Sequence, residues 1–361
     1  MIIYFTNSVG EPNHNTVTMK LVQNKNLIFG DGNVTVQSMT NLPVASIDET
    51  CTQIRSLVAA GCDIVRIALP NKNSVAAFKT VRETFPSVPL VADIHFDYRL
   101  AIAAMECGAD KIRINPGNIL ASQLDEVIAC AKANDAIIRV GVNGGSVDKQ
   151  CLADANGDKC QALFDSLSKF VRYIESKNFE KLVLSAKSSD VRETVRLNRL
   201  VAKLGSPLQV GVTEAGLAQQ GIVKNSIGIG ALLLDGIGDT VRVSLTADPV
   251  EEVAAALEIL RALGLKQGVT FVSCPKCGRC SIDLEGVARE IYQYVKGKEQ
   301  NVKIAVMGCE VNGPGECSAA DLGLAGANGK FVFFKRGQKY KTVEAEKGVE
   351  LFKKEIDLLT K

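Results

Sequence analysis

A short run of β-branched and aliphatic residues, then a turn, then an amphipathic helix recurs along the chain from about residue 34 to residue 264. Such alternation is typical of βα units in a parallel sheet. The runs are VTVQSM, DIVRIAL, PLVADI, KIRIN, IIRVGVN, KLVLSAK, PLQVGVT and DTVRVSL. Eight units in about 230 residues predict a (β/α)8 TIM barrel. An open doubly wound sheet is the alternative, but the sequence has neither a GxGxxG nor a GxxxxGK[ST] fingerprint.

The repeat is interrupted once and ends well before the last residue. The interruption, residues 144–160, is polar and contains glycine, which predicts a long βα loop suited to an active-site lid. Beyond LGLKQG the pattern changes to strand VTFVSC, helix LEGVAREIYQYVKG, strands KIAVMGC and KFVFFKRG, and helix VEAEKGVELFKKEIDLL. We therefore expect an α/β protein with a TIM barrel over residues 1–264 and a smaller α/β domain over residues 265–361.

Composition and charge limit the kinds of molecule that the protein is expected to bind. The net charge is +2 and charged residues make up 23%, so there is no basic field of the kind that drives nucleic-acid or membrane binding. The N-terminus lacks the features of a signal peptide, and the longest apolar stretch, SIGIGALLL, is too short to cross a bilayer. We expect a cytoplasmic protein that binds a small molecule. In that compartment the eleven cysteines stay reduced and do not form a disulfide framework.

The expected barrel strands carry buried cations. Parallel strands covered on both faces should be almost wholly apolar, yet four runs place an arginine between aliphatic residues, at Arg66, Arg113, Arg139 and Arg242. One buried arginine is commonly half of a structural salt bridge, but the nearby acids Asp93 and Glu214 are too few for all of these. The pattern predicts a cationic mouth that binds a phosphate or diphosphate, with a polycarboxylate as the alternative. Other polar residues expected there are Asn115, Asn143, Lys187 and Ser244.

Histidines are scarce, since the chain holds only His14 and His95. A multi-histidine metal site in the barrel is therefore excluded. The run ADIHF places Asp93 and His95 on the same side of a strand, near its mouth-facing end. An aspartate-oriented histidine that donates a proton or hydrogen bond to the substrate is one interpretation, and a histidine that caps the barrel interior is the other.

The stretch SCPKCGRC places three thiols, Cys274, Cys277 and Cys280, in eight residues, and MGCEVNGPGEC adds Cys309, Glu316 and Cys317. A structural zinc ion takes four thiolate or histidine ligands, which the first three thiols and Cys309 would supply. Loops of the Cys-Pro type are also common around iron-sulfur clusters, and this is the interpretation we favour. Spacing does not decide the fourth ligand, for which Cys280, Cys317 and Glu316 all qualify.

These motifs, in this order, carry a resemblance to a known family. SCPKCGR and VMGCEVNGPGE, together with VQSMT, ADIHF, IRINPGN, RVGVN, GVTEAG and GDTVRVSLTADP, resemble the 4-hydroxy-3-methylbut-2-enyl diphosphate synthases of the non-mevalonate isoprenoid pathway. The match extends from about residue 20 to the last helix, in the compact two-domain bacterial form. Cys280 in CGRC departs from the usual family pattern.

The resemblance implies a [4Fe-4S] cluster held in the smaller domain by Cys274, Cys277, Cys309 and Glu316. It implies reductive opening and dehydroxylation of 2-C-methyl-D-erythritol 2,4-cyclodiphosphate, with two electrons from a flavodoxin or ferredoxin. It also implies a homodimer in which the barrel of one subunit faces the cluster domain of the other. Glu214, Asp93 and His95 would orient or protonate the departing hydroxyl. The rival functions are a redox-silent lyase or transferase that uses Lys187 as a Schiff base, and an iron-sulfur carrier or sensor.

Overall fold

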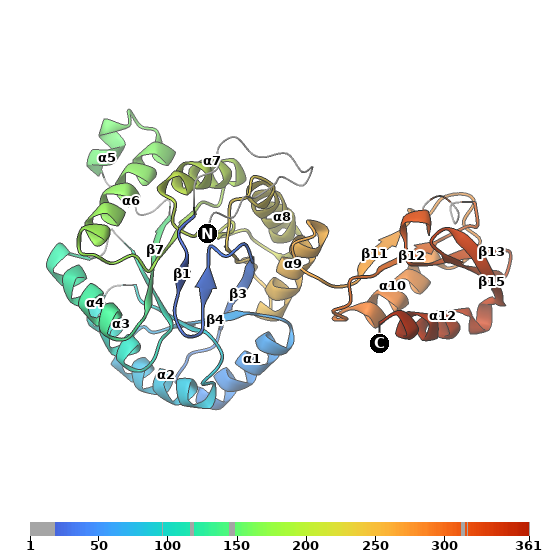
Figure 1. The fold of residues 1–361 in the computed structure, drawn as a ribbon, viewed down its shortest axis with the longest axis horizontal. Coiled ribbons are helices and arrows are strands. Elements are labelled where there is room, and N and C mark those ends of the chain that lie inside the picture. The colour runs from blue at the N-terminus through green and yellow to red at the C-terminus, as the bar shows by residue number, and fades with distance from the viewer. Residues whose placement is uncertain are drawn as a thin grey trace. The chain divides into compact units, whose positions relative to one another are not determined.

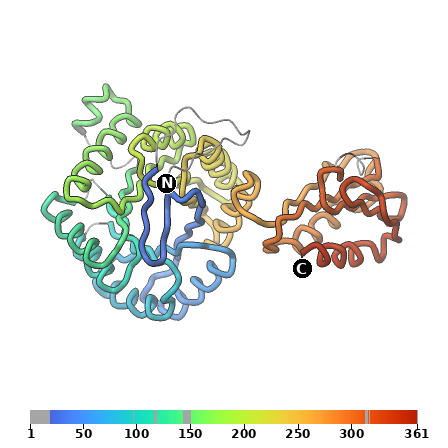
Figure 2. The backbone as a smooth tube through the Cα atoms, in the orientation of Figure 1, coloured from blue at the N-terminus to red at the C-terminus, as the bar shows by residue number. Residues whose placement is uncertain are grey.

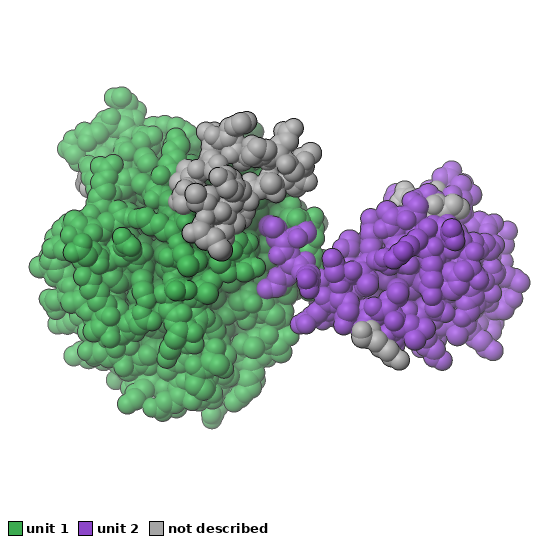
Figure 3. All heavy atoms as spheres, in the orientation of Figure 1, with its two compact units in different colours: residues 1–263 green, residues 264–361 purple. Residues whose placement is uncertain are grey.

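The computed structural model describes residues 19–95, 97–115, 119–143, 149–311, 315 and 317–360. The chain divides into two compact units, Met1–Leu263 and Gly264–Lys361, which Figure 3 colours separately. The course of the backbone through each unit can be followed in Figure 2. Among the described residues, no helix combines the length and the apolar character that a membrane span requires.

The first unit is a parallel β-barrel (Figure 1). Its eight strands run in the order β8-β7-β6-β5-β4-β3-β10-β9, and a parallel bridge between Leu184 and Leu208 joins the two outer strands. Every run predicted as a barrel strand forms one, so the predicted fold is confirmed. The strands are β3 (Thr35–Met39), β4 (Ile64–Ala68), β5 (Leu90–Asp93), β6 (Lys111–Ile114), β7 (Ile137–Asn143), β8 (Leu182–Lys187), β9 (Gln209–Val210) and β10 (Thr240–Val241).

Helices follow the strands and surround the barrel (Figure 1). They are α1 (Ile47–Ala59), α2 (Lys72–Thr84), α3 (Tyr98–Glu106), α4 (Ala121–Ala133), α5 (Lys149–Asp154), α6 (Lys159–Ser176), α7 (Val191–Val201), the short 3₁₀ helix η2 (Ala202–Leu204), α8 (Ala218–Leu234) and α9 (Pro249–Ala262). Several begin at a side chain that accepts a backbone N–H of the first turn and so stabilises the start of the helix. These capping residues are Asn71, Asp97, Asp158, Asp190 and Asp248.

The prediction of one long loop over residues 144–160 is wrong for its middle part. Helix α5 occupies residues 149–154, with Cys151 buried, and α6 begins at Lys159. The polar composition of this segment gave no indication of the short helix α5. Helix α6 begins where the Asp158 carboxylate accepts hydrogen bonds from the N–H groups of Cys160 and Gln161. Residues 144–148 lie outside the described part of the chain.

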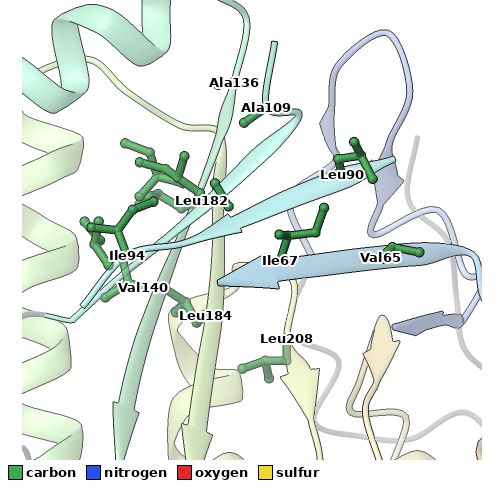
Figure 4. Close-up of a cluster of buried hydrophobic side chains, with 14 of the residues drawn as sticks. Val65, Ile67, Leu90, Ile94, Ala109, Ala136, Val140, Leu182, Leu184 and Leu208 are labelled. Atoms are coloured by element: carbon green, nitrogen blue, oxygen red, sulfur yellow. The ribbon is translucent and has the colours of Figure 1, made fainter. Parts of the chain in front are cut away.

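Apolar side chains on the outward faces of the strands form the main core against the helices. Figure 4 shows Val65, Ile67, Leu90 and Leu182 among them. Because side chains alternate along a strand, this packing directs the residues between them into the barrel. Ile112 and Ile114 belong to the outer core, so Arg113 between them faces the interior.

A hairpin absent from the sequence prediction closes one end of the barrel. Strands β1 (Val22–Gln23) and β2 (Ile28–Phe29) pair antiparallel. Val22, Leu27 and Phe29 form a buried cluster with residues near the starts of four barrel strands. Those four are Ile64, Val91, Ile137 and Val183. The hairpin therefore seals the amino ends of the strands and leaves their carboxyl ends as the mouth.

The second unit is a mixed five-stranded sheet in the order β11-β12-β13-β14-β15. The first three strands are parallel and the last three antiparallel. Helices α10 and α12 cover one face, with Ile291, Phe352 and Ile356 in its core. The elements are β11 (Thr270–Ser273), α10 (Leu284–Val295), β12 (Lys303–Met307), the 3₁₀ turn η3 (Cys317–Ala319), β13 (Leu322–Ala327), β14 (Lys330–Lys335), β15 (Gln338–Glu344) and α12 (Ala345–Leu359).

Candidate active site: a cationic barrel mouth and a cysteine loop

The strand register brings the predicted charged residues together inside the barrel. Asp93 is opposite Arg113 in the β5–β6 pair, and Arg113 is opposite Arg139 in the β6–β7 pair. All three side chains are buried. Adjacent inward residues at the same register lie in one layer of a barrel, so the arginines that are far apart in sequence form one surface.

Asp93 is the central acid of this layer. Its Oδ2 lies 2.6 Å from Nη2 of Arg66 and 3.0 Å from Nε2 of His95, and its Oδ1 lies 3.9 Å from Nη1 of Arg113. Burial would raise the pKa of Asp93, but the charge of Arg66 and the His95 hydrogen bond hold that pKa well below its usual range. This shift favours the ionised carboxylate. Of its two predicted roles, Asp93 is therefore better suited to orient a neighbour than to donate a proton.

His95 is held from both sides of its ring. Besides the contact of Nε2 with Asp93, Nδ1 lies 3.4 Å from Nη1 of Arg113. Because the guanidinium only donates, this geometry fits the tautomer in which Nε2–H donates to Asp93 and Nδ1 accepts from Arg113. The imidazole side chain is 54% exposed at the mouth. His95 must release one of these contacts before it can donate to a substrate.

On the far side of the mouth, two residues that the sequence analysis did not identify hold the remaining arginines. Gln209 of β9 accepts a hydrogen bond from Arg139 through its side-chain oxygen. Glu252 of α9 lies 3.9 Å from Arg242, and it also accepts hydrogen bonds from Ser38 and from the Leu245 N–H. The Arg139 contact uses Nη1 and the Arg242 ion pair involves Nη2, and neither uses the Nε of its guanidinium.

The mouth holds more donors than its own acceptors satisfy. Among the described residues, the buried Nε atoms of Arg66, Arg113, Arg139 and Arg242 have no hydrogen-bond partner. Burial of a donor without a partner costs about 1–3 kcal/mol, and more when the group is charged. Buried, fork-shaped cations with unused donors are suited to an oxyanion with several oxygens, such as a phosphate or diphosphate.

Lys187 adds an amine nearer the mouth than the arginine layer. It ends β8, opposite Asn143 of β7 and four residues beyond Val183, which is opposite Arg139. Burial lowers the pKa of Lys187 well below its ordinary value, and the charges of Arg242, Arg139 and Arg66 lower it further. An anion bound in the mouth would reverse this effect, because its negative charge favours the protonated amine.

The remaining predicted residues are at the ends of strands or in the loops after them. Glu214 is exposed in the loop after β9 and has a φ of 51°, a left-handed conformation that is uncommon for a residue with a side chain. Asn115 directly follows β6, and Ser244 is half-buried after β10. Asn143 ends β7, but its side chain lies outside what the structure describes. No described ion pair joins Glu214 to the arginines.

Several buried polar residues of the interior were missed. Gln37 on β3 is fully buried, and both of its side-chain polar atoms lack a described partner. Lys111 on β6 is fully buried two residues before Arg113, with its Nζ 4.6 Å from the ring centroid of Phe29. The sequence held the signal for both, because each is a polar residue in a run of β-branched and aliphatic residues. The arginines were recognised by the same feature.

In the second unit, the sheet places two of the thiol segments side by side. Strands β11 and β12 are parallel, with Ser273 opposite Val306. Cys274 comes directly after β11 and Cys309 shortly after β12, so both lie at the same edge of the sheet. The Gly308 N–H donates to Sγ of Cys274 at 3.2 Å. Cys309 is buried, whereas Cys277 is exposed in the loop.

The cysteine loop also borders a groove of about 430 Å³. Cys274 and Lys276 lie on its wall beside Phe271 and Tyr292, whose rings meet edge to face at 5.6 Å. Glu316, the predicted fourth ligand, lies outside the described residues. Among those that are described, no three His, Cys, Asp or Glu side chains are already grouped to hold a metal ion, so the ligand set stays a prediction.

Comparison with known proteins decides the family. A family model described as the GcpE TIM-barrel domain matches residues 18–257, and one described as the GcpE protein C-terminal domain matches residues 270–358. The chain belongs to the GcpE family. The two matched regions correspond to the barrel and to the mixed sheet with its cysteine loop.

GcpE relatives with curated names are similar over nearly the whole chain. The 4-hydroxy-3-methylbut-2-en-1-yl diphosphate synthase (flavodoxin) of Desulfotalea psychrophila is 48% identical, covering 91% of this chain and 92% of that protein. The proteins of the same name from Nitratidesulfovibrio vulgaris and Caldanaerobacter subterraneus are each 46% identical. They match 91% and 92% of this chain, and 86% and 95% of their own lengths. The resemblance noted in the sequence is confirmed.

Proposed function

We propose that this GcpE protein is an iron-sulfur oxidoreductase of isoprenoid biosynthesis that converts 2-C-methyl-D-erythritol 2,4-cyclodiphosphate to 4-hydroxy-3-methylbut-2-enyl diphosphate. The observation that carries the proposal is the set of buried arginine Nε donors in the barrel mouth with no described partner. Such a surface suits a compact diphosphate. The curated names of relatives that match 91–92% of this chain supply the product, and the motifs' resemblance to these synthases implies the cyclic substrate.

The reaction is tested by direct assay. The anaerobically purified protein, given a chemical one-electron reductant and the cyclic diphosphate, should form the open hydroxylated diphosphate, detected by mass spectrometry. The same protein should leave inorganic pyrophosphate and open-chain sugar phosphates unchanged. Absence of product from a protein that contains iron and sulfide would contradict the proposed reaction.

The barrel residues supply binding and charge. Arg66, Arg113, Arg139, Lys187 and Arg242 would hold the diphosphate and stabilise it as a leaving group, with Asn115, Asn143 and Ser244 beside them. Asp93 keeps Arg66 and His95 in position. Since the ionised form of Asp93 is favoured, we assign proton donation to the departing hydroxyl to His95 or Glu214.

Binding should take up protons. In the free protein, burial and neighbouring cations depress the pKa of Lys187, and a diphosphate anion raises it again. Affinity should therefore decrease as the pH rises through the Lys187 pKa of the complex. Titration calorimetry of the oxidised protein over a range of pH, in two buffers of different ionisation enthalpy at each pH, measures the uptake. Lys187→Met should reduce it, whereas a heat independent of buffer in the unaltered protein would contradict this account.

The cysteine loop fits the metal group that the family implies. Cys274 and Cys309 follow adjacent parallel strands and Cys277 lies in the loop after the first of them, and cysteine is the soft donor that an iron-sulfur cluster takes. We propose the [4Fe-4S] type, with Glu316 as the fourth ligand, because a carboxylate is more readily exchanged than a thiolate. When bound, the cluster supplies the electrons that arginine and histidine cannot provide.

The electrons come from outside the chain. Neither a flavin nor a nicotinamide fingerprint is present in the sequence, and the curated relatives carry flavodoxin in their names. We propose a flavodoxin as the donor, with ferredoxin as the alternative. We place the reaction in the cytoplasm, where thiolates remain reduced and available to iron.

We propose further that the enzyme is a homodimer whose active site combines the barrel of one subunit with the cluster unit of the other. Co-expression of Arg139→Met and Cys309→Ser chains tests this. With random pairing, about half of the dimers contain one chain of each variant. Each mixed dimer has one intact site and one site with both defects, so about one quarter of full activity should return. A site built within one chain would give no recovery, because every chain then carries a defect. Each variant expressed alone is the control.

A further inference from the structure

Two small residues line the interior of the barrel beside the arginines, Gly141 on β7 and Ser185 on β8. They are opposite each other in the strand register. Val140 and Leu184, the residues before them, pack in the outer core (Figure 4). Because side chains alternate along a strand, positions 141 and 185 face inward. Gly141 is two residues beyond Arg139 on the same strand, so it lies one step nearer the mouth.

The missing side chain of Gly141 leaves a space between two buried polar groups. A Cβ atom added there would lie 2.9 Å from Oγ of Ser185 and 3.3 Å from Nε of Arg113, with Cγ of Arg113 at 3.9 Å. Hydrogen bonds to oxygen are about 2.5–3.0 Å long from a hydroxyl and about 2.7–3.2 Å long from an N–H group. An oxygen atom at this point, shifted slightly toward Arg113, would therefore be within hydrogen-bond distance of both groups.

The Arg113 donor beside this space is unused. Arg113 is 7% exposed, and its Nε has no hydrogen-bond partner among the described residues. Its Nη1 is directed toward Asp93 and His95 instead. Because a buried donor without a partner is costly, an acceptor placed at the Nε–H would be bound favourably. The buried hydroxyl of Ser185 can rotate to donate to the same acceptor.

The backbone does not by itself require glycine at position 141. Gly141 lies within a strand and is not one of the glycines with a positive φ. Gly211, which follows β9, is a contrasting case, because a Cβ there would lie 2.1 Å from the carbonyl oxygen of Arg242. Gly211 is therefore explained by close backbone packing, whereas the space at Gly141 is bordered by polar side-chain atoms.

We propose that Gly141 is a specificity-determining residue, which keeps open the position of one non-bridging phosphoryl oxygen of the bound diphosphate. That oxygen accepts hydrogen bonds from Nε of Arg113 and from Oγ of Ser185. The inference rests on the proposed function and assigns two further residues, Gly141 and Ser185, to its binding site. A side chain at position 141 would exclude the oxygen and leave the Arg113 donor unpaired.

A comparison of four proteins tests the proposal. The unaltered chain, Gly141→Ala, Ser185→Gly and the double variant are titrated with the cyclic diphosphate by calorimetry in their oxidised form. Ser185→Gly removes the atom that an alanine at position 141 would press against most closely. If crowding between the two strands were the whole effect, the alanine would cost no affinity in that background. We expect it to weaken binding at least tenfold in both backgrounds, because the methyl group occupies the place of the oxygen.

Stability and iron content provide the controls. Gly141→Ala should lower the melting temperature through its contact with Ser185, and the double variant should recover it, while iron content stays unchanged in both. Gly230→Ala on α8 is the matched control, because a Cβ there has no described atom within 4 Å. It should bind the cyclic diphosphate as tightly as the unaltered chain.

A crystal structure of the oxidised protein with the cyclic diphosphate gives the most direct measurement. It should show a phosphoryl oxygen about 3 Å from both Nε of Arg113 and Oγ of Ser185. A bound diphosphate with no oxygen at this position, or equal affinities of Ser185→Gly and the double variant, would overturn the inference and leave the proposed function standing. An unaltered protein that binds no cyclic diphosphate would overturn the proposed function itself, so the two failures are distinguishable.

Discussion

Replacement of Cys309 by serine should abolish turnover and remove the iron-sulfur absorption together. Cys309 is buried beside β12, while Cys277 is exposed in its loop. A serine hydroxyl is a poor ligand for iron. Because position 309 is buried, water cannot take the place of the lost thiolate unless this end of the sheet opens. The remaining thiolates do not enclose a cluster, so we expect iron and sulfide near zero and activity reduced at least a thousandfold.

A buried cysteine of the barrel provides the matched control. Cys62 donates its thiol to the Ile64 carbonyl at 3.1 Å, and burial raises its pKa to about 12. A thiol that stays protonated is not a metal ligand. Cys62→Ser should therefore retain the cluster. Iron, sulfide and visible absorption measured on both variants separate the two positions, and a Cys309→Ser protein with full iron content would remove Cys309 from the ligand set.

The second large effect is expected at Arg139. Its side chain is buried, one end is held by Gln209 and its Nε has no described partner. Hydrogen bonds to charged groups contribute about 1.5–3 kcal/mol each, so loss of a two-pronged contact should raise the Michaelis constant at least about 100-fold. Arg139→Lys should recover only part of this, because the ammonium keeps the charge but lacks the fork. The iron content should not change.

Arg82 is a suitable control for Arg139. It is buried to a similar extent, but it lies on α2 and pairs with Asp110 at 2.7 Å, outside the strand mouth. Removal of Arg82 leaves the buried Asp110 carboxylate without its cation, so Arg82→Met should lower the melting temperature. The Arg82→Met protein that remains folded should have the same Michaelis constant as the unaltered enzyme. Equal Michaelis constants for the Arg139→Met and unaltered enzymes would contradict the cationic mouth.

The barrel and its charged layer could be predicted because both depend on residues within a strand. Arg113 is conspicuous between Ile112 and Ile114, and the same pattern recurs in other runs. The partners of the arginines could not be predicted in this way. Glu252 reaches Arg242 from the following helix, and the Asp93–Arg66 pair joins neighbouring strands. Such contacts depend on packing between elements, which a strand pattern does not encode.

The elements that were missed lack the usual strand signals. Strand β13 reads LGLAGA, whose glycines and alanines have low strand propensity, yet most of it is buried in the centre of the sheet. Strand β15 reads QKYKTVE and is a polar strand at the edge of the sheet. The β1–β2 hairpin has two residues in each strand. In each case long-range burial or pairing, rather than local composition, determines the structure.

The most direct test of the account is an anaerobic spectrum of the purified chain, with iron and sulfide counts, recorded with and without the cyclic diphosphate. The account predicts a brown protein with about four iron and four sulfide atoms per chain, whose spectrum changes when the cyclic diphosphate is added. A colourless protein that contains zinc, or a brown protein whose spectrum does not respond to saturating cyclic diphosphate, would contradict it.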